Sequence, residues 1–139
     1  MDVREIRLPI QNEMDVARAA LQTGSFCAAL GFDRSRCQMA ATAVSELGTN
    51  IIKYALRGEV ILRSIARREA KGVEMIAEDH GPGITDLEQA LRDHFSSSGT
   101  LGLGLPGVRR VMDEFHIESQ PGQGTRVTAR KWRQGSTPC

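Results

Sequence analysis

The alternation and spacing of hydrophobic residues predict a strand and then a helix at the start of the chain. Residues 5–10 alternate polar and apolar side chains, as in a half-buried strand, and Pro9 favours a place at the edge of a sheet. A helix is predicted to follow and to end near Gly31, because glycine is common at helix C-termini. Apolar residues recur along it at helical spacing, first at Met14, Ala17 and Leu21 and then over residues 28–30.

A second helix is predicted over residues 34–56, with Asp33 as its N-terminal cap. Its apolar positions fall on one stripe, as in a helix that packs one face against a core. The stripe consists of Ala40, Val44, Leu47, Ile51 and Ala55. This face is therefore predicted to be buried.

The middle of the chain predicts two strands and a short helix. The strands, residues 59–67 and 72–78, are rich in Val, Ile and Leu and are joined by a basic turn. Asp79 follows the second strand and so lies where that strand ends. A capping box at residues 85–88 predicts a short helix that ends at about Arg92.

The last third combines a polar segment, a helix and a hairpin. Residues 93–100 are polar and have the composition of a flexible lid, and helical spacing returns over residues 105–115. Two further strands, residues 115–120 and 125–132, flank a Pro-Gly-Gln-Gly turn and are predicted to form a hairpin.

Composition indicates one domain. The chain has 139 residues, of which 40% are hydrophobic and 25% charged, so we assign residues 1–133 to a single domain and residues 134–139 to a loose tail. A net charge of +1 gives no electrostatic reason to expect nucleic acid or a membrane surface as a partner. Cys27, Cys37 and Cys139 are odd in number and lack metal-like spacing, which favours reduced thiols in a cytoplasmic protein.

Two glycine-rich segments, residues 78–83 and 96–108, predict a nucleotide site, because glycine lets backbone N–H groups approach an anion. Residues 102–107 also spell the G-x-G-x-x-G of a dinucleotide fold, but a polar run precedes them and Pro106 interrupts them. A Walker A motif fails as well, since Val-Arg stands where Lys-Ser/Thr must bind phosphate. Glycines in ordinary surface turns are the alternative for either segment alone.

Three polar residues lie on one face of the second helix. Glu46, Asn50 and Lys53 follow one another at i, i+4 and i+7 and border the apolar stripe. A carboxylate can accept a proton, an amide oxygen can bind a hard metal ion, and a cation can offset phosphate charge. The set suits a Mg-nucleotide site, although a solvated helix edge would show a similar pattern.

Together these motifs resemble the GHKL superfamily of ATP-binding proteins, whose Bergerat fold is shared by histidine kinases and gyrase. Residues 46–55 resemble its N box, residues 79–83 its first glycine box, residues 99–104 its second glycine box, and Gly124-Thr125 its closing Gly-Thr. The resemblance implies an α+β fold, a two-layer sandwich with a mixed, mostly antiparallel sheet and helices on one face. Within the superfamily, residues 98–115 look most like the RsbT-type serine/threonine kinases.

The resemblance also implies a role for each matching residue. Glu46 would be the general base, Asn50 the Mg²⁺ ligand, and Asp79 the reader of the adenine amine. His80 departs from the family, which often has Asn there. The implied ATP-binding set is Asn50, Lys53, Asp79, Gly81, Gly83, Gly99, Thr100, Leu101, Gly102, Leu103, Gly104 and Thr125. Lys53 and the second glycine box would meet the phosphates, and Thr125 would support the adenine end.

The activity implied by the resemblance is transfer of phosphate from Mg-ATP to a serine or threonine of a protein. In RsbT-type systems the substrate is an RsbS-like STAS-domain antagonist, sometimes held with RsbR-like proteins in a stressosome, and the released kinase can activate an RsbU-like phosphatase of the PP2C type. Two alternatives remain: an anti-sigma factor of the RsbW or SpoIIAB type, and a nucleotide-gated binding module with little catalysis. The Leu-Pro-Gly-Val-Arg-Arg run at residues 105–110 favours the kinase.

Overall fold

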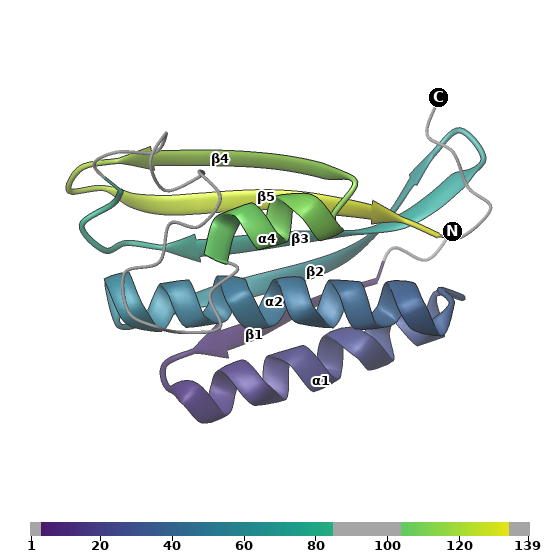
Figure 1. The fold of residues 1–139 in the computed structure, drawn as a ribbon, viewed down its shortest axis with the longest axis horizontal. Helices are drawn as coiled ribbons and strands as arrows, with labels where there is room; N and C mark the ends of the chain where they lie inside the picture. The colour runs from purple at the N-terminus through teal and green to yellow at the C-terminus, as the bar shows by residue number, and fades with distance from the viewer. Residues whose placement is uncertain (1–3, 85–103, 134–139) are drawn as a thin grey trace.

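The structure is a computed structural model that describes residues 4–84 and 104–133. Its elements, in chain order, are β1 (Glu5–Ile10), α1 (Glu13–Ala29), α2 (Arg34–Ala55), β2 (Gly58–Arg67), β3 (Ala70–Asp79), α4 (Gly104–Val111), β4 (Glu114–Gln120) and β5 (Gly124–Trp132). In this part of the chain five strands form one sheet, in the order β1-β2-β3-β5-β4, and the helices lie on one of its faces (Figure 1).

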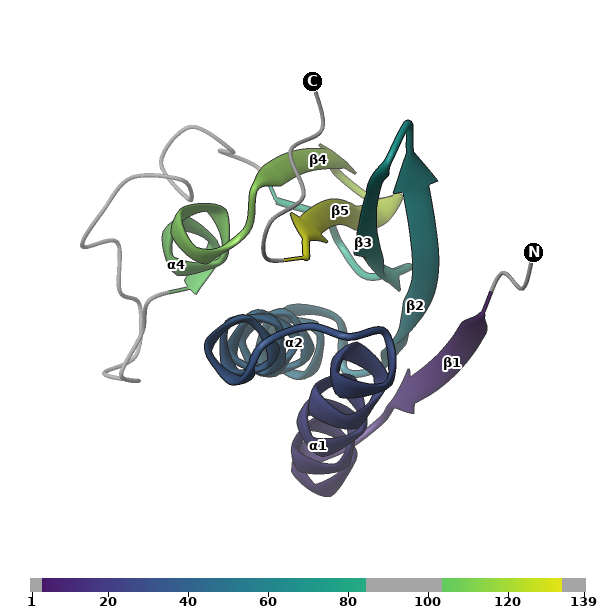
Figure 2. The same ribbon diagram turned by 90° about the vertical axis from the view of Figure 1, so that its right-hand side faces the viewer.

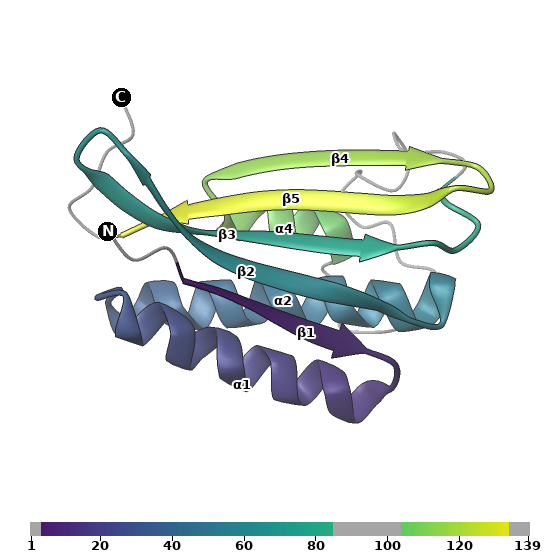
Figure 3. The same ribbon diagram turned by 180° about the vertical axis from the view of Figure 1, so that it is seen from behind.

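The sheet is antiparallel in every pairing that the structure describes. β1 is an edge strand, as its proline predicts, and β4 forms the other edge. Seen end-on, α1 and α2 lie side by side against the sheet, and α4 lies beside α2 (Figure 2). From behind, the strands are in front of all these helices (Figure 3). The expected two-layer α+β sandwich is confirmed.

The second helix forms as the sequence predicts. Asp33 caps α2, because its side chain accepts a hydrogen bond from the backbone N–H of Arg36 at 3.1 Å. Four residues of the predicted stripe are at most 2% exposed, and they form the centre of the core: Ala40, Val44, Leu47 and Ile51. None of the helices among the described residues is long and apolar enough to cross a membrane.

The first helix buries a face other than the one whose spacing predicts it. Met14 and Leu21 are 70% and 76% exposed. The buried face consists of Val16, Ala19, Thr23, Phe26 and Cys27. Its middle residue is polar, but the Thr23 hydroxyl donates to the carbonyl of Ala19 at 2.7 Å, so burial leaves no unpaired group. A hydrophobic pattern misses a face that contains such a threonine.

The helix predicted over residues 105–115 is shorter in the structure, where α4 ends at Val111. The next residues join the sheet instead. The Asp113 N–H donates to the carbonyl of Arg130 at 2.9 Å, and the Asp113 carboxylate accepts from the N–H of Trp132 at 2.8 Å. Pairing with β5 therefore stops the helix before its apolar spacing runs out.

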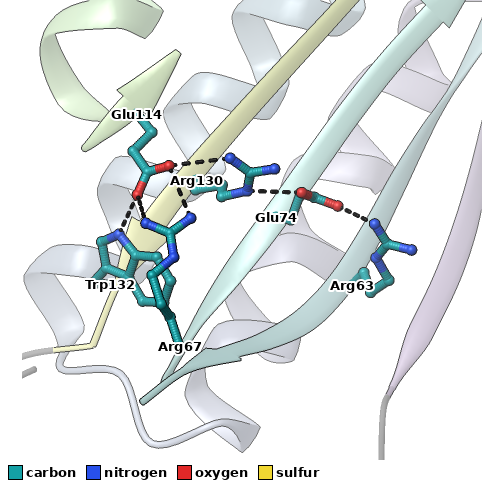
Figure 4. Close-up of polar contacts among 6 residues, drawn as sticks. All are labelled: Arg63, Arg67, Glu74, Glu114, Arg130 and Trp132. Carbon is teal, nitrogen blue, oxygen red and sulfur yellow. Dashed lines mark hydrogen bonds and ion pairs between the residues drawn. The ribbon is translucent and has the colours of Figure 1, made fainter. Parts of the chain in front are cut away.

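Charged residues cover part of the sheet face that lies opposite the helices (Figure 4). Glu74 lies between two arginines: it pairs with Arg63 on one side and accepts from Nε of Arg130 at 2.8 Å on the other. Arg130 also donates a hydrogen bond from its Nη1 to the carboxylate of Glu114 at 3.1 Å. Burial alone would raise the pKa of Glu74, but the hydrogen bonds and charges of its two arginines outweigh it and hold that pKa below its ordinary value.

Replacing Glu74 with Gln is expected to lower the free energy of unfolding by about 1–3 kcal/mol near neutral pH, because both arginines lose a charged partner at a carboxylate that is 4% exposed. A lowered folded-state pKa stabilises the fold above the unfolded value, about 4.3, and this contribution disappears as the pH falls through the folded value. The difference between wild type and Glu74→Gln should therefore narrow at acid pH.

Urea unfolding followed by circular dichroism, in steps from about pH 7 to about pH 3, measures this difference. Glu59→Gln is the control, because Glu59 belongs to an exposed pair with Arg7 and should matter little. Equal stabilities of wild type and Glu74→Gln at neutral pH would show that the paired charges contribute nothing net.

Candidate functional site

Three polar side chains lie in one row across the end of the sheet. Asp79 on β3 is paired in register with Thr125 on β5, and Thr125 is paired with Ser119 on β4. Successive side chains of a strand point to opposite faces, so each lies on the same face as the residue two positions away. The residues two positions from the members of this row are part of the core beneath the helices or pack against it: Ala77, Val127 and Ile117. The row therefore faces the helix side of the sheet.

Asp79 ties the turn after β3 to β5. Its Oδ1 accepts hydrogen bonds from the N–H of Gly81 at 3.0 Å and from the N–H of Thr125 at 3.2 Å. Both bonds use the same oxygen, and Oδ2 takes part in neither. The carboxylate is thus fixed by the backbone on one side while a second acceptor oxygen remains for a ligand.

Gly81 and Gly83 allow this turn to fit between α2 and the β4–β5 turn. A Cβ at Gly81 would come within 2.5 Å of the Cβ of Ala55, at the end of α2. Gly83 has a φ of +80°, and a Cβ there would lie 2.3 Å from the carbonyl oxygen of Gln120. Packing against α2 and against the β4–β5 turn therefore requires glycine at both positions.

The N-box face of α2 meets the start of α4. Oε2 of Glu46 accepts a hydrogen bond from the N–H of Gly104 at 3.2 Å, and Glu46 and Asn50 are both half-buried. The carboxylate thus lies at the N-terminal end of α4, where the helix dipole favours negative charge. Lys53 is exposed, with its Nζ 5.2 Å from the ring centroid of Tyr54.

The two groups lie at different positions along α2. The turn at Gly81 touches Ala55, whereas Gly104 touches Glu46, which is nine residues earlier, or roughly 13 Å along the helix axis. That spacing suits an extended nucleotide with its nucleobase near Asp79 and its phosphates near Glu46.

Asn50 fits the expected role in binding Mg²⁺. Among the described residues no cluster of three or more His, Cys, Asp or Glu could hold a metal ion. Mg²⁺ in nucleotide sites, however, takes most of its ligands from phosphates and water and needs one or two protein oxygens. A half-buried amide one helical turn from Glu46 can supply such an oxygen.

Several predicted residues cannot be placed. Gly99, Thr100, Leu101, Gly102 and Leu103 lie outside the described residues, as do the expected helix at residues 85–92 and the expected lid. Their roles stay predictions. Gly104 is the one residue of the second glycine box that the structure describes, and its contact with Glu46 joins that box to the N box.

Ser119 was missed by the sequence reasoning. Its Oγ accepts from the N–H of Ile84 at 2.7 Å and lies 2.8 Å from Oγ1 of Thr125. An open pocket at this end of the sheet is lined by Asp79, Ser119 and Thr125, and it extends to Glu118 and other side chains at the ends of β3, β4 and β5. The predicted hairpin could have indicated Ser119, because the register of the hairpin places it opposite Thr125.

Comparison with known proteins shows the family to which the chain belongs. The family model of the histidine kinase-like ATPase domain matches residues 8–131. The serine/threonine-protein kinase RsbT of Bacillus subtilis is 44% identical over 123 residues, which cover 88% of this chain and 92% of the relative. An anti-sigma F factor of Caldanaerobacter subterraneus is 35% identical over 97 residues, 66% of each chain.

Among solved structures, the mycobacterial sensor histidine kinase MprB matches with a TM-score of 0.53, over 95% of this chain and 98% of its own. At 19% identity this likeness concerns the fold alone. The family match, over residues 8–131, covers both halves of the candidate site. The chain therefore belongs to the histidine kinase-like ATPase family and, within it, to the group of RsbT-type serine/threonine-protein kinases.

Proposed function

We propose that this kinase transfers the γ-phosphoryl group of Mg-ATP to a serine or threonine of a small STAS-domain antagonist in a bacterial partner-switching pathway. The observation that carries the proposal is the Glu46–Gly104 contact, which brings a proton-accepting carboxylate to the positive end of α4. A kinase needs such a base beside its phosphate site, whereas a binding module does not. The 44% identity to RsbT supports this choice.

The proposed site has an adenine-binding end and a phosphate-binding end. Oδ2 of Asp79 accepts from the exocyclic amine of adenine, while Oδ1 stays bound to the backbone N–H groups of Gly81 and Thr125. An acceptor at this point favours adenine over guanine, which carries a carbonyl oxygen there. At the other end Asn50 would hold Mg²⁺, which would offset the phosphate charge, and Lys53 and the second glycine box would reach the phosphates.

Glu46 acts on the incoming protein substrate. Its carboxylate takes the proton of the serine or threonine hydroxyl as that oxygen forms its bond to the γ-phosphorus and the bond to the β-phosphate oxygen breaks. The products are ADP and a phosphoprotein. The half-buried carboxylate is held at the N-terminal end of α4 by its contact with Gly104, and the phosphates would bind beside it.

The proposed partners follow from the RsbT group. They are an RsbS-like STAS protein, alone or with RsbR-like proteins in a stressosome, and an RsbU-like phosphatase that the released kinase activates. We also place the protein in the cytoplasm, where Cys27 and Cys37, both free thiols, would stay reduced. Neither nucleic acid nor a membrane is proposed as a partner, and the net charge of +1 agrees with this.

A second candidate function is that of an anti-sigma factor. The observation in its favour is the 35% identity to an anti-sigma F factor. The two functions differ in the protein that is bound, because a kinase of the RsbT type binds its STAS substrate and an anti-sigma factor binds a sigma factor.

Size-exclusion chromatography with purified STAS proteins and sigma factors from the source cell separates these functions. With Mg-ADP present, we expect this kinase to elute with a STAS protein and not with any sigma factor. A stable complex with a sigma factor and none with a STAS protein would overturn the proposal in favour of the anti-sigma function.

A further inference from the structure

The side chain of Ser119 lies between Thr125, at the proposed adenine-binding end of the site, and Ile84, which follows the first glycine box. Its Oγ accepts the N–H of Ile84 at 2.7 Å and touches Oγ1 of Thr125 at 2.8 Å. No motif of the family resemblance includes it, and the roles proposed above do not use it. We infer that Ser119 is a positioning residue that turns the Thr125 hydroxyl into a donor toward the adenine ring, an inference that rests on the proposed function.

The hydrogen atoms of the two hydroxyl groups decide the direction of this contact. The hydroxyl group of Ser119 has a single hydrogen, and two acceptors lie within its reach: Oγ1 of Thr125 at 2.8 Å and the carbonyl oxygen of Gly124 at 3.2 Å. Hydroxyl donors prefer about 2.7–2.8 Å and are seldom longer than about 3.0 Å. We assign the Ser119 hydrogen to the shorter of these two contacts, so that Ser119 donates to Thr125, while the N–H of Ile84 occupies one of the lone pairs of Ser119.

The Thr125 hydroxyl then keeps its hydrogen for a ligand. Because it already accepts from Ser119, it presents a donor on the helix side of the sheet, in the same row as Oδ2 of Asp79. The row thus offers one acceptor and one donor side by side. Adenine presents the complementary pair, an amine donor and the N1 acceptor, whereas hypoxanthine and guanine present the reverse pair.

The experiment compares ATP with 1-deaza-ATP, in which a C–H group replaces N1 and the amine is kept. The ratio of their dissociation constants measures the contact at N1 alone, since Asp79 meets the same amine in both. In wild type we expect ATP to bind about three- to tenfold more tightly, the range of one neutral hydrogen bond. Calorimetry with the Mg²⁺ complex of each nucleotide gives the ratio.

Ser119→Ala should reduce this ratio to about twofold or less, because the Thr125 hydroxyl then rotates freely. Ser119→Thr, which restores a hydroxyl, should recover it, and Thr125→Val should abolish it. Ser64→Ala is the matched control: Ser64 also lies on a strand and accepts one backbone N–H, from Arg4 at 2.8 Å, but it is paired with Val73 away from the site.

The outcomes separate this inference from the proposed function. If Ser119→Ala weakens both nucleotides equally and leaves the ratio unchanged, Ser119 is structural and the inference is overturned. If wild type binds ATP and 1-deaza-ATP alike, no donor meets N1 and the inference again fails, while the kinase proposal stands. If wild type binds neither nucleotide, the proposed function itself fails. Should Ser119→Ala not fold, the isosteric Ser119→Cys, a weak donor, is measured by the same criterion.

Discussion

Replacing Glu46 with Gln is expected to reduce the rate of phosphoryl transfer by about 10²–10⁴-fold, the usual contribution of a general base. Binding of Mg-ATP should change little, because a general base acts on the attacking hydroxyl and adds little affinity for the nucleotide. The maximal rate should therefore fall while the dissociation constant stays nearly the same.

The contact with Gly104 allows this substitution to separate the chemical role of Glu46 from its structural role. Gln keeps a side-chain oxygen that can accept the Gly104 N–H, so the connection between α2 and α4 survives the change. What disappears is the capacity to take a proton. A loss of rate then reports on chemistry and not on the packing of α4.

Single-turnover transfer to a STAS protein, together with calorimetry of Mg-ATP, measures the two quantities separately. Glu69→Gln is the matched control, because Glu69 lies exposed in the turn between β2 and β3. A normal rate in Glu46→Gln would remove Glu46 from the chemistry. A rate loss with an equal loss of nucleotide binding would indicate a structural role instead.

Asp79→Asn is expected to weaken ATP binding by about 5- to 150-fold, which corresponds to about 1–3 kcal/mol. The two backbone N–H groups decide how the new amide is oriented. Gly81 and Thr125 both donate to the position of Oδ1, so the amide oxygen must stay there and the NH₂ group must take the place of Oδ2. A donor then faces the adenine amine.

Calorimetry with ATP and with ITP tests this result, because the carbonyl of hypoxanthine can accept from the new NH₂ group. Asp79→Asn should lose affinity for ATP and gain it for ITP. Asp113→Asn is the control, since Asp113 also accepts a backbone N–H of β5, from Trp132 at 2.8 Å, at the opposite end of the strand. Unchanged affinity for ATP in Asp79→Asn would place the base elsewhere.

Local rules were sufficient to predict much of the fold and part of the site. The cap at Asp33, the buried stripe of α2 and the hairpin with Gly122 all depend on residues close together in the sequence. Asp79 was placed at the end of a strand for the same reason, and the structure agrees.

Contacts between distant segments could not be predicted in the same way. Glu46 and Gly104 are 58 residues apart, and no spacing rule connects them. The buried face of α1 depends on packing and on Thr23, whose hydroxyl is satisfied within the helix. The end of α4 is set by the pairing of Asp113 with β5. Ser119 acquires its contacts from strand register and from the returning chain at Ile84.

The most direct test of the central claim is transfer of a radiolabelled γ-phosphate from ATP to candidate STAS-domain proteins, followed by mapping of the modified residue. Wild type with Mg²⁺ should label a single serine or threonine of a STAS protein, and Glu46→Gln should leave that residue unlabelled while still binding ATP and the partner. A wild-type protein that binds both Mg-ATP and a STAS protein tightly but labels no residue would contradict the account and identify a nucleotide-gated binding module instead.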